Sequence, residues 1–132
     1  GSNSLIANNG LILALANDLR PNINYVNSSA DHLHYLLGRN SLNLSFVTAT
    51  GSQSPHNLHH RPALAVQTML PGALVGGPNA SLEDPITQSL FSDQTPPARC
   101  YIDNTESYST NEVAIYWNSP LIALISVVEK NN

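Results

Sequence analysis

The chain has 132 residues, of which 42% are apolar and 11% are charged, and its formal net charge is −4. This size and composition suit one globular domain at most. Five Lys and Arg residues form no basic patch for a phosphate backbone, so we expect no nucleic-acid partner. No apolar run approaches the roughly 20 residues needed to cross a bilayer, so we expect no membrane partner either. A neutral ligand fits this charge better. The opening Gly1-Ser2 is typical of the scar that a cleaved tag leaves.

Two helices are predicted in the first part of the chain. Apolar residues recur at helical spacing from about Leu5 to Leu19, and Pro21 ends that pattern. Ser28 or Ser29 is a suitable N-cap for a second helix, and Gly38 is well placed just after its end. Two helices joined by a short loop form an antiparallel hairpin.

The segment from Asn40 to Asn111 is different in character, being rich in Pro, Gly, Ser, Asn and Thr. Only Leu44–Thr48 has the pattern of a short strand. A loop of this length inside a compact protein is either disordered or a binding surface carried by a rigid scaffold. Its aromatic and histidine residues favour the binding surface.

A third helix closes the chain, because Ser119-Pro120 has the signature of a helix start. The residues after it are apolar on nearly all sides, which predicts a buried helix. Three helices with one very long loop present more apolar surface than 132 residues can cover. The chain therefore looks like a piece of something larger.

One motif carries most of the chemical information. The run from Tyr101 to Ser119 reads YIDNTESYSTNEVAIYWNS and resembles the C-terminal signature of family 9 of the glycoside hydrolases. That signature has an aromatic residue, an aspartate, a second aromatic residue, a glutamate, a small residue, and then an asparagine followed by a small residue. Its positions are matched by Tyr101, Asp103, Tyr108, Glu112, Ala114, Asn118 and Ser119.

Other landmarks of that family occur in the family order. The run from Ser45 to Arg61 is similar to a second signature that ends in His-x-Arg, here within His59, His60 and Arg61. It departs from the usual pattern at Ala49, Gln53 and Leu58. The segments YLLGRN at 35–40 and PGALVGGPN at 71–79 are also similar to family segments. Together these resemblances cover nearly the whole chain.

The resemblance implies a mainly α fold. The family's catalytic domain is an (α/α)6 barrel, and residues 1–132 would be the C-terminal part of it. This part would consist of three helices and a long irregular region, residues 40–111, that lines the cleft. The family's N-terminal catalytic motif, Asp-Ala-Gly-Asp, does not occur in this sequence. A missing N-terminal segment would then supply the catalytic base and be a partner of this chain. The resemblance also implies a secreted, extracellular parent protein and chemistry that requires no cofactor. It leaves a structural calcium undecided.

The implied reaction is hydrolysis of β-1,4-glucosidic bonds in cellulose or a related β-glucan, with inversion of configuration. Such a reaction uses one protonated and one ionised carboxyl group on either side of the bond. The resemblance makes Glu112 the general acid, and that role needs a raised pKa, for which Tyr108, Val113 and Trp117 are candidate apolar neighbours. Without the resemblance, Glu112 reads as a first-turn residue stabilised by a helix dipole.

The same resemblance assigns further residues. Asp103 would be the second signature carboxylate, positioning the substrate or a neighbouring loop, and an Asx-turn at Asp103-Asn104 is the other reading. His59 and Arg61 would bind sugar hydroxyls, since residues two apart in an extended chain face the same side and His60 then faces the protein. No further ligand lies at a suitable spacing from these histidines, so we expect no zinc site.

Tyr108 and Trp117 are aromatic candidates for contact with sugar rings, whose apolar faces stack on such side chains. A core position is the other reading for Trp117. A different class of function also stays open, a catalytically incomplete carbohydrate-binding or remnant domain. The sequence does not distinguish endo from exo cleavage or glucose from amino-sugar specificity. An exposed apolar seam would favour self-association or pairing with the missing segment.

Overall fold

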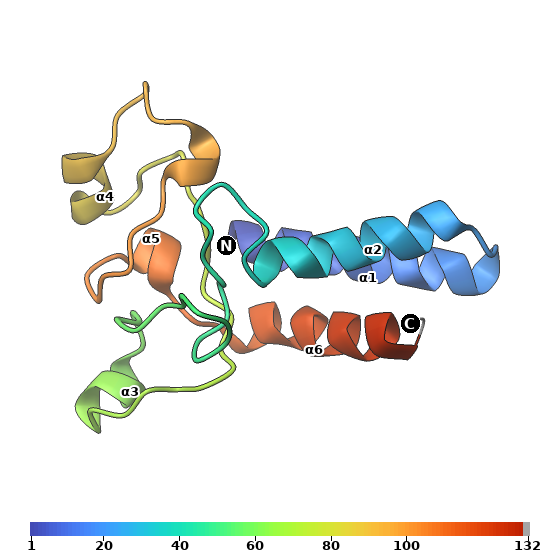
Figure 1. The fold of residues 1–132 in the computed structure, drawn as a ribbon. Helices are drawn as coiled ribbons and strands as arrows, with labels where there is room; N and C mark the ends of the chain where they lie inside the picture. Colours follow the sequence, from blue (N-terminus) through green and yellow to red (C-terminus); the bar gives the residue numbers. More distant parts are fainter. Residues whose placement is uncertain (131–132) are drawn as a thin grey trace.

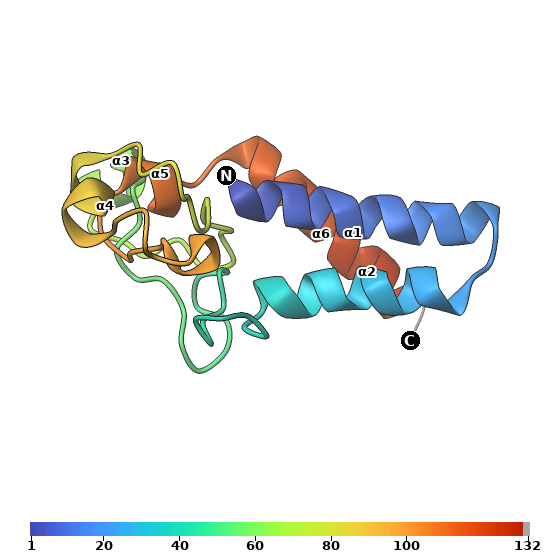
Figure 2. The same ribbon diagram turned by 90° about the horizontal axis from the view of Figure 1, so that it is seen from above.

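The computed structural model describes residues 1–130, in which the three longest helices pack side by side as a bundle (Figures 1 and 2). We call these helices the helical arm: α1 (Ser2–Leu19), α2 (Ile23–Leu36) and α6 (Ile115–Lys130). Residues 37–114, which we call the loop lobe, gather at one end of the arm. They carry four short helical segments: α3 (Arg61–Ala65), α4 (Pro85–Leu90), a 3-10 turn (Pro97–Arg99) and α5 (Tyr108–Asn111). The predicted mainly α class is confirmed.

Helix α1 packs on its neighbours through small residues. Ala7, Gly10 and Ala14 are buried along one side of it. A Cβ added at Gly10 would lie 2.9 Å from the Cβ of His32 in α2 and 3.0 Å from a methyl carbon of Leu124 in α6. Glycine therefore allows the three helices to approach one another closely at this level.

Helix α2 begins earlier than its sequence predicts. The N-cap is Asn22, whose side chain accepts a hydrogen bond from the backbone two residues later, so the predicted start at Ser28 or Ser29 is wrong. Ser29 is instead buried inside the helix, where its hydroxyl donates to the carbonyl of Gly10 in α1 over 2.9 Å. The predicted end is confirmed, since Gly38 follows the helix with a φ of 122°.

Helix α6 also begins earlier than predicted, at Ile115, so that Pro120 lies inside it. A tertiary contact secures this extra turn. The Asn118 side chain accepts a hydrogen bond of 2.7 Å from the backbone N–H of Leu74 in the loop lobe. The helix-start signature of Ser119-Pro120 is therefore overridden by contacts that the local sequence does not reveal.

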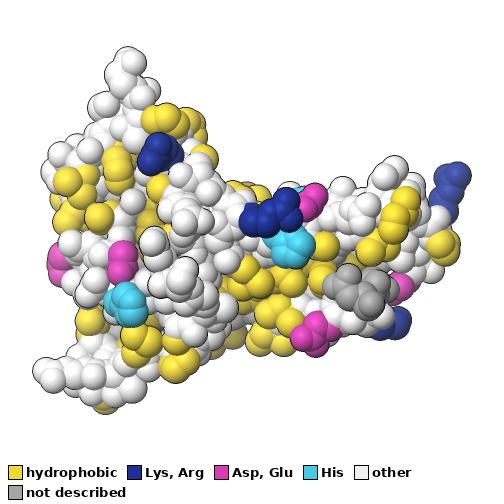
Figure 3. All heavy atoms as spheres, in the orientation of Figure 1, with side chains coloured by type: hydrophobic (Ala, Val, Ile, Leu, Met, Phe, Trp, Pro, Cys, Tyr) yellow, Lys and Arg dark blue, Asp and Glu magenta, His cyan; other side chains and the backbone are white. Residues whose placement is uncertain are grey.

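The arm leaves large apolar side chains in solvent, and yellow patches mark such side chains on its surface in Figure 3. The closing helix was expected to be buried all round, yet Ile122 is 65% exposed while Leu121 and Leu124 are buried. Among the described helices, α1 and α2 make the main contacts with α6, and they leave one side of it uncovered. None of the helices within residues 1–130 combines the length and the hydropathy that a membrane span requires. The exposed large apolar residues on α1 and α6 are Leu5, Ile12, Leu15, Leu19, Ile115, Tyr116 and Ile122.

Phe46 links the arm to the loop lobe. It is fully buried, and its ring centroid lies 5.8 Å from that of Tyr35 in α2 and 5.3 Å from that of Tyr101. The segment Leu44–Thr48, predicted as a short strand, pairs antiparallel with residues 72–75 but makes only one isolated bridge, between Val47 and Leu74. Phe46 lies in a bend and Thr48 in a turn, so the predicted strand does not form.

Candidate active site

Backbone pairings bring distant segments of the loop lobe together around Glu112. The bridges join Val47 to Leu74, Val75 to Val113, and His59 to Glu112. The N–H of Gly76 donates to the carbonyl of Glu112 over 2.9 Å. The N–H of His59 donates to the carbonyl of Asn111 over 3.0 Å. Three segments that are far apart in sequence therefore meet around Glu112. They are the PGALVGGPN segment, the His-His-Arg segment and the signature that contains Glu112.

His59 and Glu112 point to the same side of this assembly. They are paired directly across a parallel bridge. Their chain neighbours, His60 and Val113, both line an apolar hollow that also contains Ile122. Because side chains alternate along extended backbone, His59 and Glu112 face away from that hollow together. The expectation that His60 turns away from His59 is confirmed, and its ring caps α3 by accepting from the N–H of Ala63.

On the His59 side lies an open hollow of about 500 Å³. Tyr108 forms part of it, with its ring centroid 6.1 Å from that of His59 and the two rings inclined at 65°. The Tyr108 hydroxyl donates to the carbonyl of Glu83 over 2.6 Å, which fixes the ring. Glu106 is exposed at the rim of this hollow. The other lining residues, Pro85, Ile86 and Ser89, come from α4.

The imidazole of His59 has a defined orientation. Its Nδ1 lies 2.6 Å from the carbonyl oxygen of Thr105. A carbonyl only accepts hydrogen bonds, so Nδ1 carries the proton. In the neutral ring, Nε2 is then an acceptor. The site thus offers an acceptor for a hydroxyl group beside an aromatic ring, which suits a neutral polyhydroxylated ligand.

Asp103 holds the loop that leads to His59. Its carboxylate accepts hydrogen bonds from the backbone N–H groups of His56 (2.9 Å) and Asn57 (2.8 Å) and from the side-chain amide of Asn111 (3.0 Å). These contacts agree with the reading of Asp103 as a positioner of a neighbouring loop. The turn expected at Asp103-Asn104 forms as well, but it is Asn104 that accepts from the backbone two residues later (2.8 Å).

Asn111 is a buried residue whose importance the sequence reading missed. Its side-chain amide donates to the carbonyl of Asn57 (2.5 Å), and its side-chain oxygen accepts from the hydroxyl of Tyr101 (2.6 Å). Burial, with the nearby charge of Asp103, raises the pKa of Tyr101, so that hydroxyl remains a donor. Asn111 therefore joins the segment before Glu112 to the segment before His59. Its place directly before the signature glutamate was the available signal.

Trp117 lies in the interior of this chain. The side chain is 8% exposed, and a Cβ added at Gly76 would lie 3.3 Å from its ring. The ring also covers Gly1 and meets Tyr116 edge-on, with centroids 5.5 Å apart. Of the two readings of Trp117, this geometry favours the core, and its contact with sugar stays a prediction.

Two further site candidates, Glu112 and Arg61, are exposed. Glu112 ends α5 in extended backbone, and its side chain is exposed. The neighbours expected to surround Glu112 do not enclose it, because Glu112 is exposed and Val113 lines the opposite hollow. Arg61 is exposed and is the first residue of α3. The extended backbone that was expected to place Arg61 on the same side as His59 therefore ends before it.

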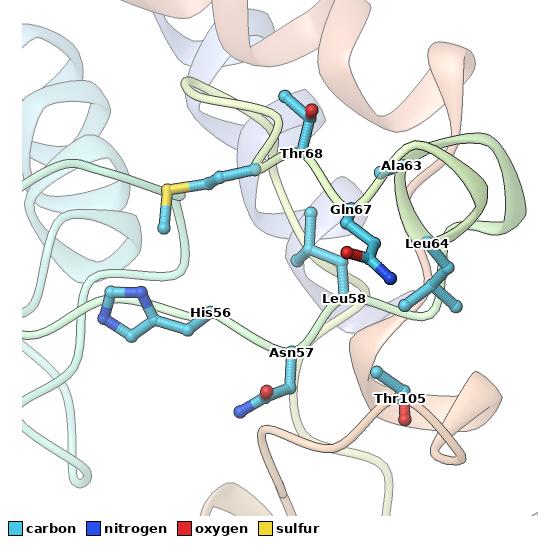
Figure 4. A pocket seen from close by; sticks show the side chains of 9 residues that line it. His56, Asn57, Leu58, Ala63, Leu64, Gln67, Thr68 and Thr105 are labelled. Atoms are coloured by element: carbon cyan, nitrogen blue, oxygen red, sulfur yellow. The ribbon is translucent and has the colours of Figure 1, made fainter.

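A third hollow, of about 240 Å³, is shown in Figure 4. It is bounded by the His56–Leu58 segment, which Asp103 holds, by α3 and the turn after it, and by Thr105, whose carbonyl binds His59. Its lining mixes polar side chains such as Asn57 and Gln67 with apolar ones such as Leu64. Among residues 1–130, no three His, Cys, Asp or Glu side chains are grouped so that they could hold a metal ion.

Comparison with known proteins gives a consistent answer. Residues 1–125 match the family model described as glycosyl hydrolase family 9. The chain is 41% identical over 125 residues to a cellulose 1,4-beta-cellobiosidase of Acetivibrio thermocellus, covering 91% of this chain and 14% of that protein. It is 39% identical over 128 residues to endoglucanase C of Cellulomonas fimi, covering 92% of this chain and 12% of that protein.

Solved structures agree. The crystal structure of the family 9 endoglucanase J30 superposes with a TM-score of 0.83 at 41% identity, over 90% of this chain and 23% of that one. AaCel9A in complex with cellobiose-like isofagomine superposes with a TM-score of 0.83 at 37% identity, over 98% of this chain and 25% of that one. The chain therefore spans about a quarter or less of the relatives that it matches.

Proposed function

Because the chain belongs to glycosyl hydrolase family 9, we propose that it forms one wall of the substrate cleft of an enzyme that hydrolyses β-1,4-glucan. The observation that carries this proposal is the bridge between His59 and Glu112, which sets the family's two signature segments side by side facing one hollow. The named activities of the cellobiosidase and endoglucanase relatives support the same substrate class.

The proposed chemistry is a single displacement with inversion. Glu112 donates its proton to the glycosidic oxygen as the bond between that oxygen and the anomeric carbon breaks. A water molecule attacks the anomeric carbon from the opposite face and gives its proton to a carboxylate about 6.5 to 9.5 Å from Glu112. We assign that carboxylate to an N-terminal segment of the catalytic domain, and we propose that residues 1–132 form the C-terminal portion of the barrel.

The substrate contacts follow from the geometry of the hollow. His59 presents Nε2 as an acceptor for a sugar hydroxyl, and the exposed ring of Tyr108 offers an apolar face. Asp103 positions the His59 side chain by fixing the loop before it. Arg61 stays a predicted donor to sugar hydroxyls near the cleft. The parent enzyme is proposed to be secreted, as an enzyme that acts on an extracellular polymer must be.

A chimaera tests the proposal. The chain would replace its matching segment in endoglucanase J30, to which it is 41% identical. We expect the chimaera to hydrolyse cellotetraose, with the α-anomer of the product appearing first by proton NMR. Glu112→Gln should lower kcat by about 10²- to 10⁴-fold, the range for removing a general acid. The matched control is Glu129→Gln, the same change at an exposed position on α6, which should leave kcat unaltered.

The alternative hypothesis, that the chain is a carbohydrate-binding or remnant domain, predicts the opposite result. It expects the chain to retain cello-oligosaccharides on its own, and it expects an active chimaera to be indifferent to Glu112→Gln. Equal rates for the Glu112→Gln and Glu129→Gln chimaeras would therefore reject Glu112 as the acid and favour the alternative hypothesis.

A further inference from the structure

The turn that carries Glu112 cannot be stable by itself. Helix α5 (Tyr108–Asn111) has four residues, and no side chain caps its first residue. One helical turn on its own is unfavourable, because fixing its backbone costs more than its hydrogen bonds return. Contacts from elsewhere must therefore hold Glu112 in place. The N–H groups of Gly77, His59 and Gly76 donate to the carbonyls of Thr110, Asn111 and Glu112. Side-chain contacts fix the start of the turn.

Asp84 supplies those contacts. It precedes α4 and is fully buried. One carboxylate oxygen accepts hydrogen bonds from the hydroxyl of Ser107 (2.8 Å) and from both the hydroxyl (2.6 Å) and the N–H (3.0 Å) of Ser109. The other oxygen accepts from the N–H of Thr87 (2.7 Å), which caps α4. A single carboxylate thus fastens α4 to the turn before Glu112.

The carboxylate is held in its charged form. Burial alone would raise the pKa of Asp84, but the hydrogen bonds from Ser109, Thr87 and Ser107 outweigh burial and lower that pKa to about 2. Hydrogen bonds to an ionised acceptor are shorter and stronger than neutral ones. This makes Asp84 a firm anchor rather than an incidental contact.

A shift of the anchored turn would reach Glu112 directly. The chain passes from Ser109 through Asn111 to Glu112, whose own carbonyl is fixed by the N–H of Gly76. Asp84 itself lines none of the hollows described, while Tyr108 does. Asp84 can therefore change the placement of the acid without touching a ligand.

We propose that Asp84 is a positioning residue for the general acid, holding Glu112 where it can protonate the leaving oxygen. This inference rests on the proposed function, in which Glu112 is that acid. It predicts a defect confined to proton donation, because the water and the catalytic base are held by other segments.

The test compares two substrates in the J30 chimaera. Cellotetraose has a poor leaving group that needs a proton, whereas 2,4-dinitrophenyl β-cellobioside releases a stable anion that needs none. For Asp84→Asn we expect kcat on cellotetraose to fall about 10- to 100-fold, the cost of a small misplacement, and kcat on the dinitrophenyl substrate to change less than about threefold. Asp93→Asn, the same change at an exposed aspartate, should leave both rates unaltered.

Equal losses on both substrates, or no loss on either, would overturn the proposal, since lost folding lowers both rates together. If Asp84→Asn does not fold, Ser109→Ala removes one of the four contacts and should give the same selective loss on a smaller scale. A Glu112→Gln chimaera run alongside separates the two ideas. If Glu112→Gln shows the selective loss and the Asp84 variant does not, only the positioning role fails; if Glu112→Gln shows none, the proposed function fails.

Discussion

The helical arm and the loop lobe are stabilised in different ways. In the arm, helices approach one another over small residues such as Gly10 and leave large apolar side chains such as Ile12 in solvent. In the lobe, buried polar side chains such as Asp84 and Asn111 hold the backbone. A loop of this length can keep one shape only if its polar groups are paired, because it has no ladder of its own. The lobe should therefore be sensitive to the loss of single polar groups, and the arm should not.

The largest effect is expected where the lobe meets the arm. Gly77 has a φ of 89°, and a Cβ there would lie 2.4 Å from the side chain of Asn3 in α1. Gly77→Ala should lower the free energy of unfolding of the chain by about 3 to 4 kcal/mol, combining backbone strain with a collision. Urea unfolding followed by circular dichroism would measure it.

Gly72 offers a matched control for that change. Its φ is 75°, but nothing lies within 4 Å of an added Cβ. Gly72→Ala should therefore cost only about 1 kcal/mol, the strain alone. Similar losses at both glycines would mean that the contact between Asn3 and Gly77 contributes little.

The next effect concerns the buried Asn111, whose side chain bonds to Tyr101, Asn57 and Asp103. Asn111→Ala should lower the free energy of unfolding by about 3 kcal/mol, because the buried Tyr101 hydroxyl loses its acceptor and the bonds to the Asn57 carbonyl and the Asp103 carboxylate are lost as well. Asn9→Ala, at an exposed position in α1, is the control and should change it by less than about 0.5 kcal/mol. If Asn111→Ala lowers the free energy of unfolding only slightly, the lobe is stabilised mainly by its apolar contacts instead.

Acid should weaken the lobe through Asp84. Because the folded pKa of about 2 lies below the ordinary value, the stabilisation is complete above about pH 4 and is lost as the pH falls toward 2. The expected loss is on the order of 2 kcal/mol. Urea unfolding of the chain and of Asp84→Asn from pH 6 to pH 2 should show a gap that narrows on acidification. A gap that stays constant would mean that the charge of Asp84 does not stabilise the fold.

The arm was predictable from local sequence more readily than the lobe. Helical spacing revealed α1, and Gly38 revealed the end of α2. The starts of α2 and α6 were misplaced because Ser29 and Asn118 serve contacts with other elements. A Ser-Pro pair reads as a helix start only when no such tertiary contact competes.

In the lobe the resemblance gave the important residues but not their arrangement. His59 and Glu112 were named, yet their pairing joins positions far apart in sequence, which no local pattern encodes. The pair Asp84-Pro85 is a typical helix start, an N-cap residue followed by proline, and this pattern could have located α4. The burial of Trp117 was open to two readings because an aromatic residue in a helix start suits a core as well as a cleft.

A small effect is expected from the buried hydroxyl of the arm. Ser29→Ala removes the hydrogen bond to the Gly10 carbonyl and should cost about 1 kcal/mol. Ser126→Ala, which removes an exposed hydroxyl bond within α6, is the control and should cost less than about 0.5 kcal/mol. A cost at Ser29 as large as that at Asn111 would erase the distinction between the two regions.

The smallest effect on stability is expected at the uncovered side of α1, where association should change instead. Ile12 and Leu19 are 62% and 89% exposed. Replacing both by serine should alter the free energy of unfolding by less than about 1 kcal/mol, since neither side chain contributes to the core. The same change removes apolar surface that favours self-association, so sedimentation velocity should show a shift toward monomer. Asn8→Ser, a polar exchange at an exposed position on the same helix, should leave the sedimentation profile unaltered. If the double variant sediments like the unmodified chain, this stripe is not the surface through which copies of the chain associate.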